Sequence, residues 1–186
     1  MMLDEKQNDD FKSILGLIPT NSVGAEIGTW RGNAANFFAR INLEKLYLVD
    51  PYSVEVVPEH NLKNFVNRYS DQIGSEDLTD FQSFYDTVYM DVVHQFKQFK
   101  HVEIYRQTSE QFFNELTEQL DWVYVDGDHS YEGCINDLRW SYKAVKSGGI
   151  ILGDDYNQCV KAIKDFCKES GLTAKRHGIR QYSIQV

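Results

Sequence analysis

The sequence of residues 121–156 is DWVYVDGDHSYEGCINDLRWSYKAVKSGGIILGDDY, and in this stretch two apolar runs each end abruptly in acidic residues. The first run is followed by Asp126, and the second by Asp154 and Asp155. Short runs rich in Val, Ile and aromatic residues, bounded by Gly and Asp, are typical of buried strands, and the segment between them, residues 131–146, is long enough for one helix. The stretch therefore predicts a β-α-β unit. Because ligands of open α/β sheets bind beyond the carboxyl ends of the parallel strands, we expect both acidic clusters at one functional edge.

The same alternation of strand and helix patterns continues on both sides of this unit. Apolar runs bounded by turn residues predict strands at 22–27, 45–49 and 102–105, and helical periodicity is found at 33–40, 84–99, 109–119 and 156–170. The last residues predict a hairpin around Gly178. Five alternating β-α units followed by a hairpin predict an α/β fold with a mostly parallel sheet and an antiparallel edge strand.

Length and charge limit the classes of protein that fit. The 186 residues are enough for one domain with a good-sized core, so residues 1–186 are expected to form a single unit. The net charge of -9 disfavours nucleic acid as the main partner, because a phosphate backbone demands a basic face. Three cysteines without metal-type spacing indicate buried thiols in a reducing compartment. Neither a signal peptide nor a membrane-spanning run is recognisable, and we expect a cytoplasmic protein.

Residues 52–82 interrupt the regular pattern. They contain Pro58 and many Asn and Asp residues, and they are too many for an ordinary strand-to-helix connection. One helix is expected near 62–69. We interpret the segment as an insertion that forms a lid over the substrate edge, with a variable surface loop as the equal alternative.

A cradle for a ligand is predicted between the first strand and the first helix. Glu26 and Gly28 begin the pattern E-x-G-x-x-x-G, which ends at Gly32. Glycines let the backbone approach a ligand closely, and the first N–H groups of the helix are unpaired. Asp50 lies at the tip of the next strand, where an acidic residue can accept hydrogen bonds from ribose hydroxyls. Because G-x-G-x-x-G is absent, a ligand with a ribose and no pyrophosphate is favoured; the turn alone is equally compatible with an ordinary strand-to-helix connection.

The three carboxylates Asp126, Asp154 and Asp155 are expected to converge if their strands are neighbours. Their mutual repulsion would raise at least one pKa, and a divalent cation would relieve it. Oxygen ligands favour Mg²⁺, Mn²⁺ or Ca²⁺ over zinc and leave positions open for a substrate hydroxyl. A cation there would make an alcohol or catechol-like diol easier to deprotonate.

His129 lies three residues after Asp126, close enough to accept the proton that such a hydroxyl loses. An imidazole with a pKa near ~6.5 suits a general base. The alternative is that residues 126–130 form a turn that caps the next helix and that His129 is simply exposed. The second acidic pair, which the fold would bring alongside, favours the catalytic interpretation.

Three segments resemble a known family: VGAEIGTWRGNAA (23–35), LYLVDPY (46–52) and nearly all of 121–156. They are similar to class I S-adenosylmethionine-dependent methyltransferases and, among these, to methyltransferase family 24. The resemblance implies a Rossmann-like fold whose seven-stranded sheet has the order 3-2-1-4-5-7-6, with strand 7 antiparallel and helices on both faces.

The resemblance also implies roles for particular residues around S-adenosylmethionine. The implied cofactor-binding set is Glu26, Gly28, Thr29 and Gly32 in the first loop, Asp50 at the ribose, Ser109 beside the adenine, and Asp126. Ser109 is equally compatible with a role in starting its helix. The D-x-x-H motif and the later acidic pair are similar to those of metal-dependent enzymes that methylate sugars of macrolide antibiotics. This implies Asp126, Asp154 and Asp155 as metal ligands, with His129 as the catalytic base assisted by Asp126.

The favoured function is an O-methyltransferase, assisted by Mg²⁺ or by Mn²⁺ or Ca²⁺, that acts on a small hydroxylated molecule such as a sugar or a polyphenol-like acceptor. One alternative is a metal-independent small-molecule methyltransferase with His129 or Asp126 as base. Another is an S-adenosylmethionine-binding module without catalysis of its own, working with a partner protein. No membrane partner is expected, and a homodimer is left open.

Overall fold

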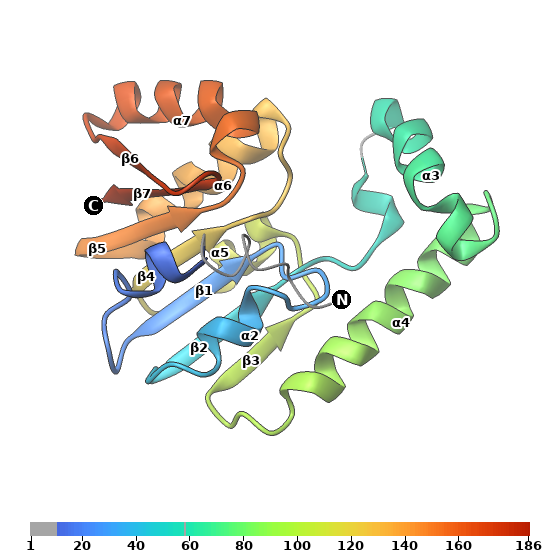
Figure 1. The fold of residues 1–186 in the computed structure, drawn as a ribbon, viewed down its shortest axis with the longest axis horizontal. Coiled ribbons are helices and arrows are strands. Elements are labelled where there is room, and N and C mark those ends of the chain that lie inside the picture. Colours follow the sequence, from blue (N-terminus) through green and yellow to red (C-terminus); the bar gives the residue numbers. More distant parts are fainter. Residues whose placement is uncertain (1–10, 58) are drawn as a thin grey trace.

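The structure, a computed structural model, describes residues 11–57 and 59–186 and contains a seven-stranded sheet (Figure 1). The strands are β1 Val23–Ile27, β2 Lys45–Val49, β3 Val102–Tyr105, β4 Leu120–Val125, β5 Val145–Gly153, β6 Ala174–His177 and β7 Gln181–Gln185. The helical elements are α2 Ala35–Phe38, the 3-10 helix η1 Val54–Val56, α3 Glu59–Ile73, α4 Leu78–Phe96, α5 Ser109–Glu115, α6 Tyr131–Ala144 and α7 Tyr156–Ser170, and residues 11–15 are helical as well.

The strand order is β3-β2-β1-β4-β5-β7-β6, which confirms the predicted topology. Strands β1 to β5 pair in parallel, and β7 runs antiparallel to β5. The expectation of an antiparallel strand at the edge is wrong in one respect, because β7 lies between β5 and β6 and β6 takes the edge. In this hairpin the second strand, β7, pairs with β5, so the first strand, β6, is left at the edge of the sheet.

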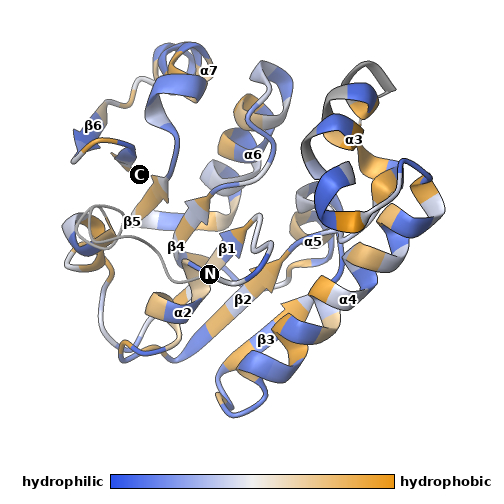
Figure 2. Cartoon of the chain, turned by 45° about the vertical axis from the view of Figure 1, so that its right-hand side comes forward, coloured by the Kyte–Doolittle hydropathy of each residue, from blue (hydrophilic) through white to orange (hydrophobic). Residues whose placement is uncertain are grey.

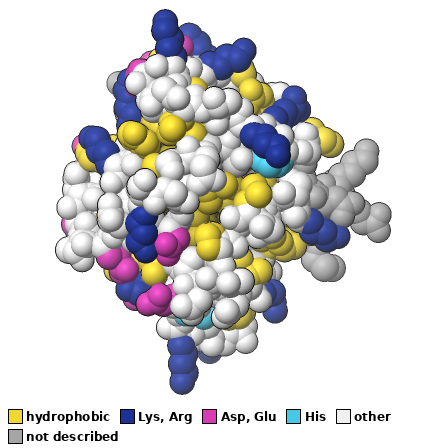
Figure 3. Space-filling view, turned by 90° about the vertical axis from the view of Figure 1, so that its left-hand side faces the viewer, with side chains coloured by type: hydrophobic (Ala, Val, Ile, Leu, Met, Phe, Trp, Pro, Cys, Tyr) yellow, Lys and Arg dark blue, Asp and Glu magenta, His cyan; other side chains and the backbone are white. Residues whose placement is uncertain are grey.

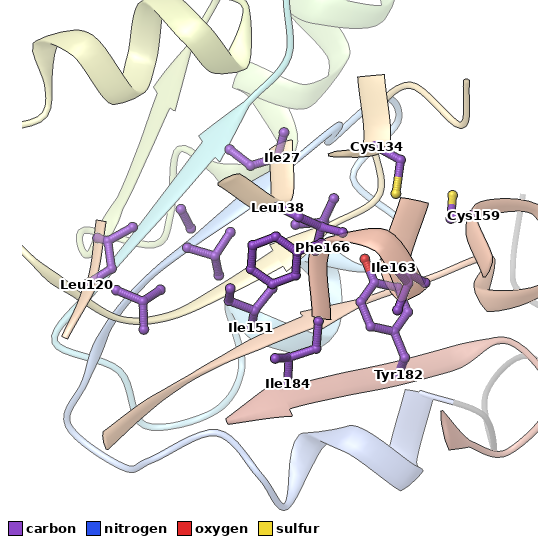
Figure 4. Close-up of a cluster of buried hydrophobic side chains, with 14 of the residues drawn as sticks. Ile27, Leu120, Cys134, Leu138, Ile151, Cys159, Ile163, Phe166, Tyr182 and Ile184 are labelled. Atoms are coloured by element: carbon purple, nitrogen blue, oxygen red, sulfur yellow. The ribbon is translucent and has the colours of Figure 1, made fainter. Parts of the chain in front are cut away.

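Alternating side chains of the strands build one apolar core on each face of the sheet. In β4, Val123 and Val125 belong to the core under α5, α6 and α7, whereas Trp122 and Tyr124 belong to the core under α2, α4 and the first helical residues. This follows from the two-residue period of a strand. Strands β1 and β2 are accordingly largely orange in Figure 2, whereas the edge strand β6 is blue, and Figure 4 shows Phe166 next to Ile151 and Ile163 next to Tyr182 in the first core.

Several elements differ in length from the predictions. Helix α2 is shorter than 33–40, α4 starts before residue 84 and ends before 99, and α5 ends before 119. Strand β5 begins at Val145, before the apolar run that precedes Asp154, and has an irregular register opposite β4. The end of the chain accounts for this: Gly148 N donates to Val186 O at 2.8 Å, and Val186 N donates to Gly149 O at 2.9 Å. The pairing keeps both glycines within β5, and Gly148 has a φ of 82°, a region that favours glycine.

The segment 52–82 forms η1, α3 and the first residues of α4. The expected helix near 62–69 is part of the longer α3, which stands beside α4 at the β3 side of the sheet (Figure 1). Phe65 of α3 stacks on Tyr85 of α4 with ring centroids 5.8 Å apart. Tyr69 of α3 lies 5.9 Å from the ring of Trp30, in the loop after β1. The segment therefore contacts the predicted ligand loop, and its role as a lid stays a prediction.

Two of the three cysteines, Cys134 and Cys159, are buried, Cys167 is partly buried, and all three are free, which agrees with the expected thiols. Among the described helices, none is long and apolar enough to span a bilayer.

Gly24 is the position where the sheet tolerates a side chain least. It pairs with Trp122 across β1 and β4, and a Cβ at Gly24 would lie 1.9 Å from an indole carbon of that residue. The indole is fully buried and donates to Ser22 Oγ at 3.1 Å, so it cannot move aside without losing that bond. Gly24→Ala is expected to lower the free energy of unfolding by about 1–3 kcal/mol, measured by urea denaturation. Gly16→Ala, which meets nothing within 4 Å, is the control; an equal effect of both would contradict the explanation.

Candidate active site

The carboxyl ends of β1, β4 and β5 bring the predicted site residues into one row. Ile27 pairs with Val125, and Val125 with Gly153, so the residues that follow these three lie side by side. Asp126 N donates to Ile27 O at 2.8 Å, and Asp154 N donates to Val125 O at 3.1 Å. The acidic clusters therefore meet at one edge of the sheet.

The loop after β1 is held against this edge by its glycines. Gly28 and Gly32 have φ angles of 89° and 72°, a region that favours glycine. A Cβ on Gly28 would lie 2.1 Å from the carbonyl oxygen of Asp126, so the two backbones are in direct contact. This approach places the loop over the end of β4, as the cradle prediction requires.

Glu26 and Thr29 are buried below the loop, with exposed fractions of 1% and 3%. Glu26 Oε2 and Thr29 Oγ1 have no hydrogen-bond partner among the described residues. Burial, followed by the neighbouring charge of Asp126, raises the pKa of Glu26 well above its ordinary value. Unpaired buried polar atoms are costly, so these two are suited to donors and acceptors of a bound ligand.

Asp50 lies at the end of β2 and organises the neighbouring backbone. Its two carboxylate oxygens accept from Trp30 N at 2.8 Å and from Tyr52 N at 2.9 Å. Trp30 and Tyr52 both have positive φ angles, 48° and 45°, and the Tyr52 hydroxyl donates to Trp30 O at 2.8 Å. Asp50 thus stabilises two strained residues, a role that the sequence did not indicate. A carboxylate oxygen has a second lone pair, so the predicted ribose contact remains compatible with this arrangement.

Ser109 is the first residue of α5, and the helix is capped by Thr108 in a capping box with Gln111. The Ser109 hydroxyl donates to Asp137 Oδ1 at 2.5 Å. Burial raises the pKa of Asp137 to about 6. Asp137 borders the loop after β4, because its Oδ2 is 2.9 Å from where a Cβ on Gly127 would lie. Asp137 was missed by the sequence analysis, and the adenine role of Ser109 stays a prediction.

His129 lies between two of the predicted acidic residues. Its Nε2 is 3.3 Å from Asp126 Oδ1, and its Nδ1 is 3.2 Å from Asp155 Oδ2. Asp155 has a left-handed backbone at the start of α7, and its side chain makes no cap hydrogen bond to that helix. The hydrogen bond to Asp126 raises the pKa of His129 to about 9, so the imidazole is protonated at neutral pH in the isolated protein. Functional sites commonly hold such strained and perturbed residues.

Donor atoms of Asp126, His129 and Asp155 lie within 4.8 Å of one another, a spacing that fits one cation. Asp154 differs from the predicted arrangement, because its carboxylate faces Arg180 in the turn between β6 and β7. Arg180 Nε and Nη2 lie 3.1 and 2.5 Å from the two oxygens of Asp154. Burial raises the pKa of Asp154 to about 6, and the charge of Asp126 acts in the same direction.

Arg180 is the main residue that the sequence analysis missed at this site. A signal existed: if β7 pairs antiparallel with β5, the turn before β7 must arrive at the carboxyl end of β5. The structure places Arg180 at one pocket together with several of the predicted site residues. Its lining includes Glu26, Gly28, Thr29, Asp126, Asp154 and Arg180.

Comparison with known proteins identifies the family of this chain. A family model described as a methyltransferase domain, of type 24, matches residues 25–156, which is more than half of the chain. The chain belongs to this methyltransferase family. It is therefore an enzyme of the class I S-adenosylmethionine-dependent methyltransferase type, and the resemblance inferred from the sequence is confirmed.

A curated relative of this methyltransferase is the uncharacterized protein R132 of Acanthamoeba polyphaga mimivirus. It is 46% identical over 41 residues, which is 22% of this chain and 19% of that protein. The match thus spans less than a fifth of R132, and it carries no information on the rest of that protein.

Solved structures share the fold of this methyltransferase at low identity. SMU.1697c of Streptococcus mutans, in complex with SAH, has a TM-score of 0.62 and 12% identity, with 99% of each chain covered. An O-methyltransferase from Bacillus cereus, also in complex with SAH, has a TM-score of 0.55 and 14% identity over 99% of this chain and 82% of that one. An rRNA methylase from Streptococcus thermophilus has a TM-score of 0.57 and 13% identity over 100% and 98%. The names of these proteins indicate different methyl acceptors, so their structural likeness to this chain supports the fold alone.

Proposed function

We propose that this methyltransferase transfers the methyl group of S-adenosylmethionine to a hydroxyl of a small molecule, a sugar or polyphenol-like acceptor, with assistance from a divalent cation. The observation that carries the proposal is the position of His129. Its imidazole lies between Asp126 and Asp155, beside the pocket under the glycine loop. A base at this edge is suited to an acceptor that must lose a proton.

The first loop supports the cofactor half of the proposal. Glu26 Oε2 and Thr29 Oγ1 are buried without partners among the described residues, and Gly28 keeps the backbone close to Asp126. These groups would hold the amino acid part of S-adenosylmethionine, with Gly32 in the same loop. Asp50 would bind the ribose, and Ser109 would lie near the adenine. The cofactor supplies an electrophilic methyl group on a sulfonium.

The donor set fits a divalent cation at Asp126 and Asp155, with His129 adjacent to both. Mg²⁺, Mn²⁺ or Ca²⁺ suits carboxylate oxygens, and such an ion would lower the pKa of a bound hydroxyl. Asp154 fits the set less well, because Arg180 and Gln181 both donate to its carboxylate. A metal-independent version of the same reaction is therefore the second candidate, with Arg180 as the observation that favours it.

In either version the protein contributes alignment and proton transfer. The acceptor oxygen attacks the methyl carbon in line with the leaving sulfur; the O–CH₃ bond forms as the S–CH₃ bond breaks. The acceptor proton goes to His129, after this residue has lost its own proton to solvent. In the metal-independent version, Asp126 and Asp155 orient the imidazole through its two nitrogens and stabilise the imidazolium that forms; in the metal-assisted version, the same carboxylates would hold the cation and His129 would lie beside it.

The charge around the site supports a small acceptor over nucleic acid. The chain has a net charge of -9, and the pocket edge carries the acidic groups described above. On the face seen in Figure 3, Lys and Arg side chains are scattered and do not form one basic stripe. A phosphate backbone is recognised by clustered basic residues.

The test has two parts. Calorimetry should show binding of S-adenosylmethionine, and mass spectrometry should show a gain of one methyl group on an acceptor from a panel of hydroxylated sugars and catechols. The panel is then repeated after chelation with EDTA and again after Mg²⁺ is restored. Loss and recovery of turnover support metal assistance, whereas undiminished turnover in EDTA supports the metal-independent candidate. Cofactor binding without any methylated product across the panel would contradict the proposal.

A further inference from the structure

Arg180 reaches the acidic edge because of the position of its turn. Gly153 at the end of β5 pairs with Tyr182 of the antiparallel β7, so the residues just before Tyr182 lie beyond the end of β5. Tyr156 N donates to Arg180 O at 2.8 Å, which ties this turn to the start of α7. The guanidinium is thus delivered by the backbone to the same place as Asp154 and Asp155.

The contacts of the guanidinium engage both residues of the acidic pair. Besides the two contacts with Asp154, its Nη2 is 3.2 Å from Asp155 Oδ1. Asp154 Oδ1 also accepts from Gln181 Nε2 at 3.0 Å and from Asp155 N at 2.7 Å. Asp154 is only 6% exposed. Its carboxylate is therefore neutralised and hydrogen-bonded by the protein itself, in a geometry that arginine forms well with carboxylates.

The pocket beside this ion pair carries two further carboxyl groups. Glu26, with its unpartnered Oε2, and Asp126, which contacts His129, line the same pocket as Arg180. A divalent cation held by Asp126 and Asp155 would lie close to the guanidinium, since that group also contacts Asp155. Two cations at such a distance repel each other. The guanidinium and the metal therefore compete for the carboxylate of Asp155.

We propose that Arg180 is the built-in counter-cation of the acidic centre: it keeps Asp154 out of the metal-ligand set and weakens the binding of divalent cations. A cation that binds uses Asp126 and Asp155, and it binds more tightly when Arg180 is removed. The inference builds on the acidic centre of the proposed function, but its test measures metal affinity and does not depend on an acceptor or on methyl transfer.

The experiment compares metal binding by wild type, Arg180→Gln, Arg180→Lys and Arg176→Gln. Arg176 lies on the same hairpin, where it donates to Ile179 O and stacks over the Tyr156 ring, which makes it the matched control. Mg²⁺ and Mn²⁺ affinities are measured by calorimetry, and the shift of the unfolding temperature with Mg²⁺ is the second readout, because a cation that binds only the folded state stabilises it.

We expect Arg180→Gln to bind Mg²⁺ at least about tenfold more tightly than wild type and to show the larger temperature shift. Arg180→Lys keeps the positive charge and should stay within about threefold of wild type, as should Arg176→Gln. If Arg180→Gln is unfolded without metal, the inference requires that Mg²⁺ restores its folding. Equal Mg²⁺ affinity in wild type and Arg180→Gln, binding to neither, or failure of Arg180→Gln to fold with and without Mg²⁺ would each overturn it.

Discussion

Substitution of His129 by glutamine is expected to lower kcat by about two to four orders of magnitude, the usual contribution of a positioned general base. Glutamine can still form hydrogen bonds to Asp126 and Asp155, which lie 3.3 and 3.2 Å from the two imidazole nitrogens, but it cannot accept the acceptor's proton. The affinity for S-adenosylmethionine should change little, because His129 is not part of the glycine loop. Steady-state kinetics and calorimetry on the same preparations check both expectations.

The pH dependence of the same enzyme gives a second readout. Because the hydrogen bond to Asp126 raises the pKa of His129 to about 9 when no cation is bound, kcat/KM should increase with pH as this residue loses its proton and then level off. The sign for stability is opposite: the protonated imidazole stabilises the fold fully below pH ~6.5, and this contribution is lost as the pH rises through about 9. His129→Gln should remove both dependences, whereas His94→Gln, at an exposed position of α4, should retain them. A flat profile in wild type or full activity of His129→Gln would rule out the role as base.

Replacement of Gly28 by alanine is expected to have the largest effect on the cofactor site. The new Cβ would lie 2.1 Å from the carbonyl oxygen of Asp126 and 2.7 Å from the Cα of Gly127, and these are backbone atoms that cannot rotate away. The φ of 89° adds a further penalty for any residue with a side chain. Together these should lower the free energy of unfolding by about 2–5 kcal/mol.

The same clash should separate the loop from the end of β4 and so weaken S-adenosylmethionine binding by about a hundredfold or more, the size of effect expected for a displacement of about 1 Å. Urea denaturation and calorimetry measure the two consequences. Gly148→Ala is the matched control: its φ is 82°, but its Cβ would meet nothing within 4 Å. That variant should lose about 1–2 kcal/mol of stability and keep its cofactor affinity. Similar cofactor affinity in both variants would show that the contact between loop and strand is unimportant.

Much of the fold could be predicted because its signals are local. Strands β2 and β3 and helix α7 begin and end at the predicted residues, since each is an apolar or amphipathic run bounded by strong turn residues. Helix α6 ends two residues earlier than predicted, because β5 starts at Val145. The start of β5 depends on pairing with the chain end, a contact between residues far apart in the sequence. Local periodicity contains no information about such a contact.

The site divides in a similar way. Asp126, His129 and Asp155 could be selected from residue type and spacing, because two strands that each end in acidic residues were expected to be neighbours at one edge of the sheet. Asp137 could not, because its partner Ser109 is 28 residues away, and Arg180, 26 residues from Asp154, could be placed only through the pairing of β7 with β5. Such partners depend on how α5 packs against α6 and where the β6–β7 turn ends.

The sequence by itself determined the α/β class, the parallel core of the sheet and the edge at which the acidic residues meet. Each follows from apolar periodicity and from the rule that parallel strands present their carboxyl ends on one side. Only the tertiary structure decided which cation neutralises the acidic pair. Strand β7 inserts between β5 and β6, and this brings the guanidinium of Arg180 onto Asp154. Electrostatic interactions of this kind depend on distances of a few ångströms between distant parts of the chain, and these distances exist only in the folded protein.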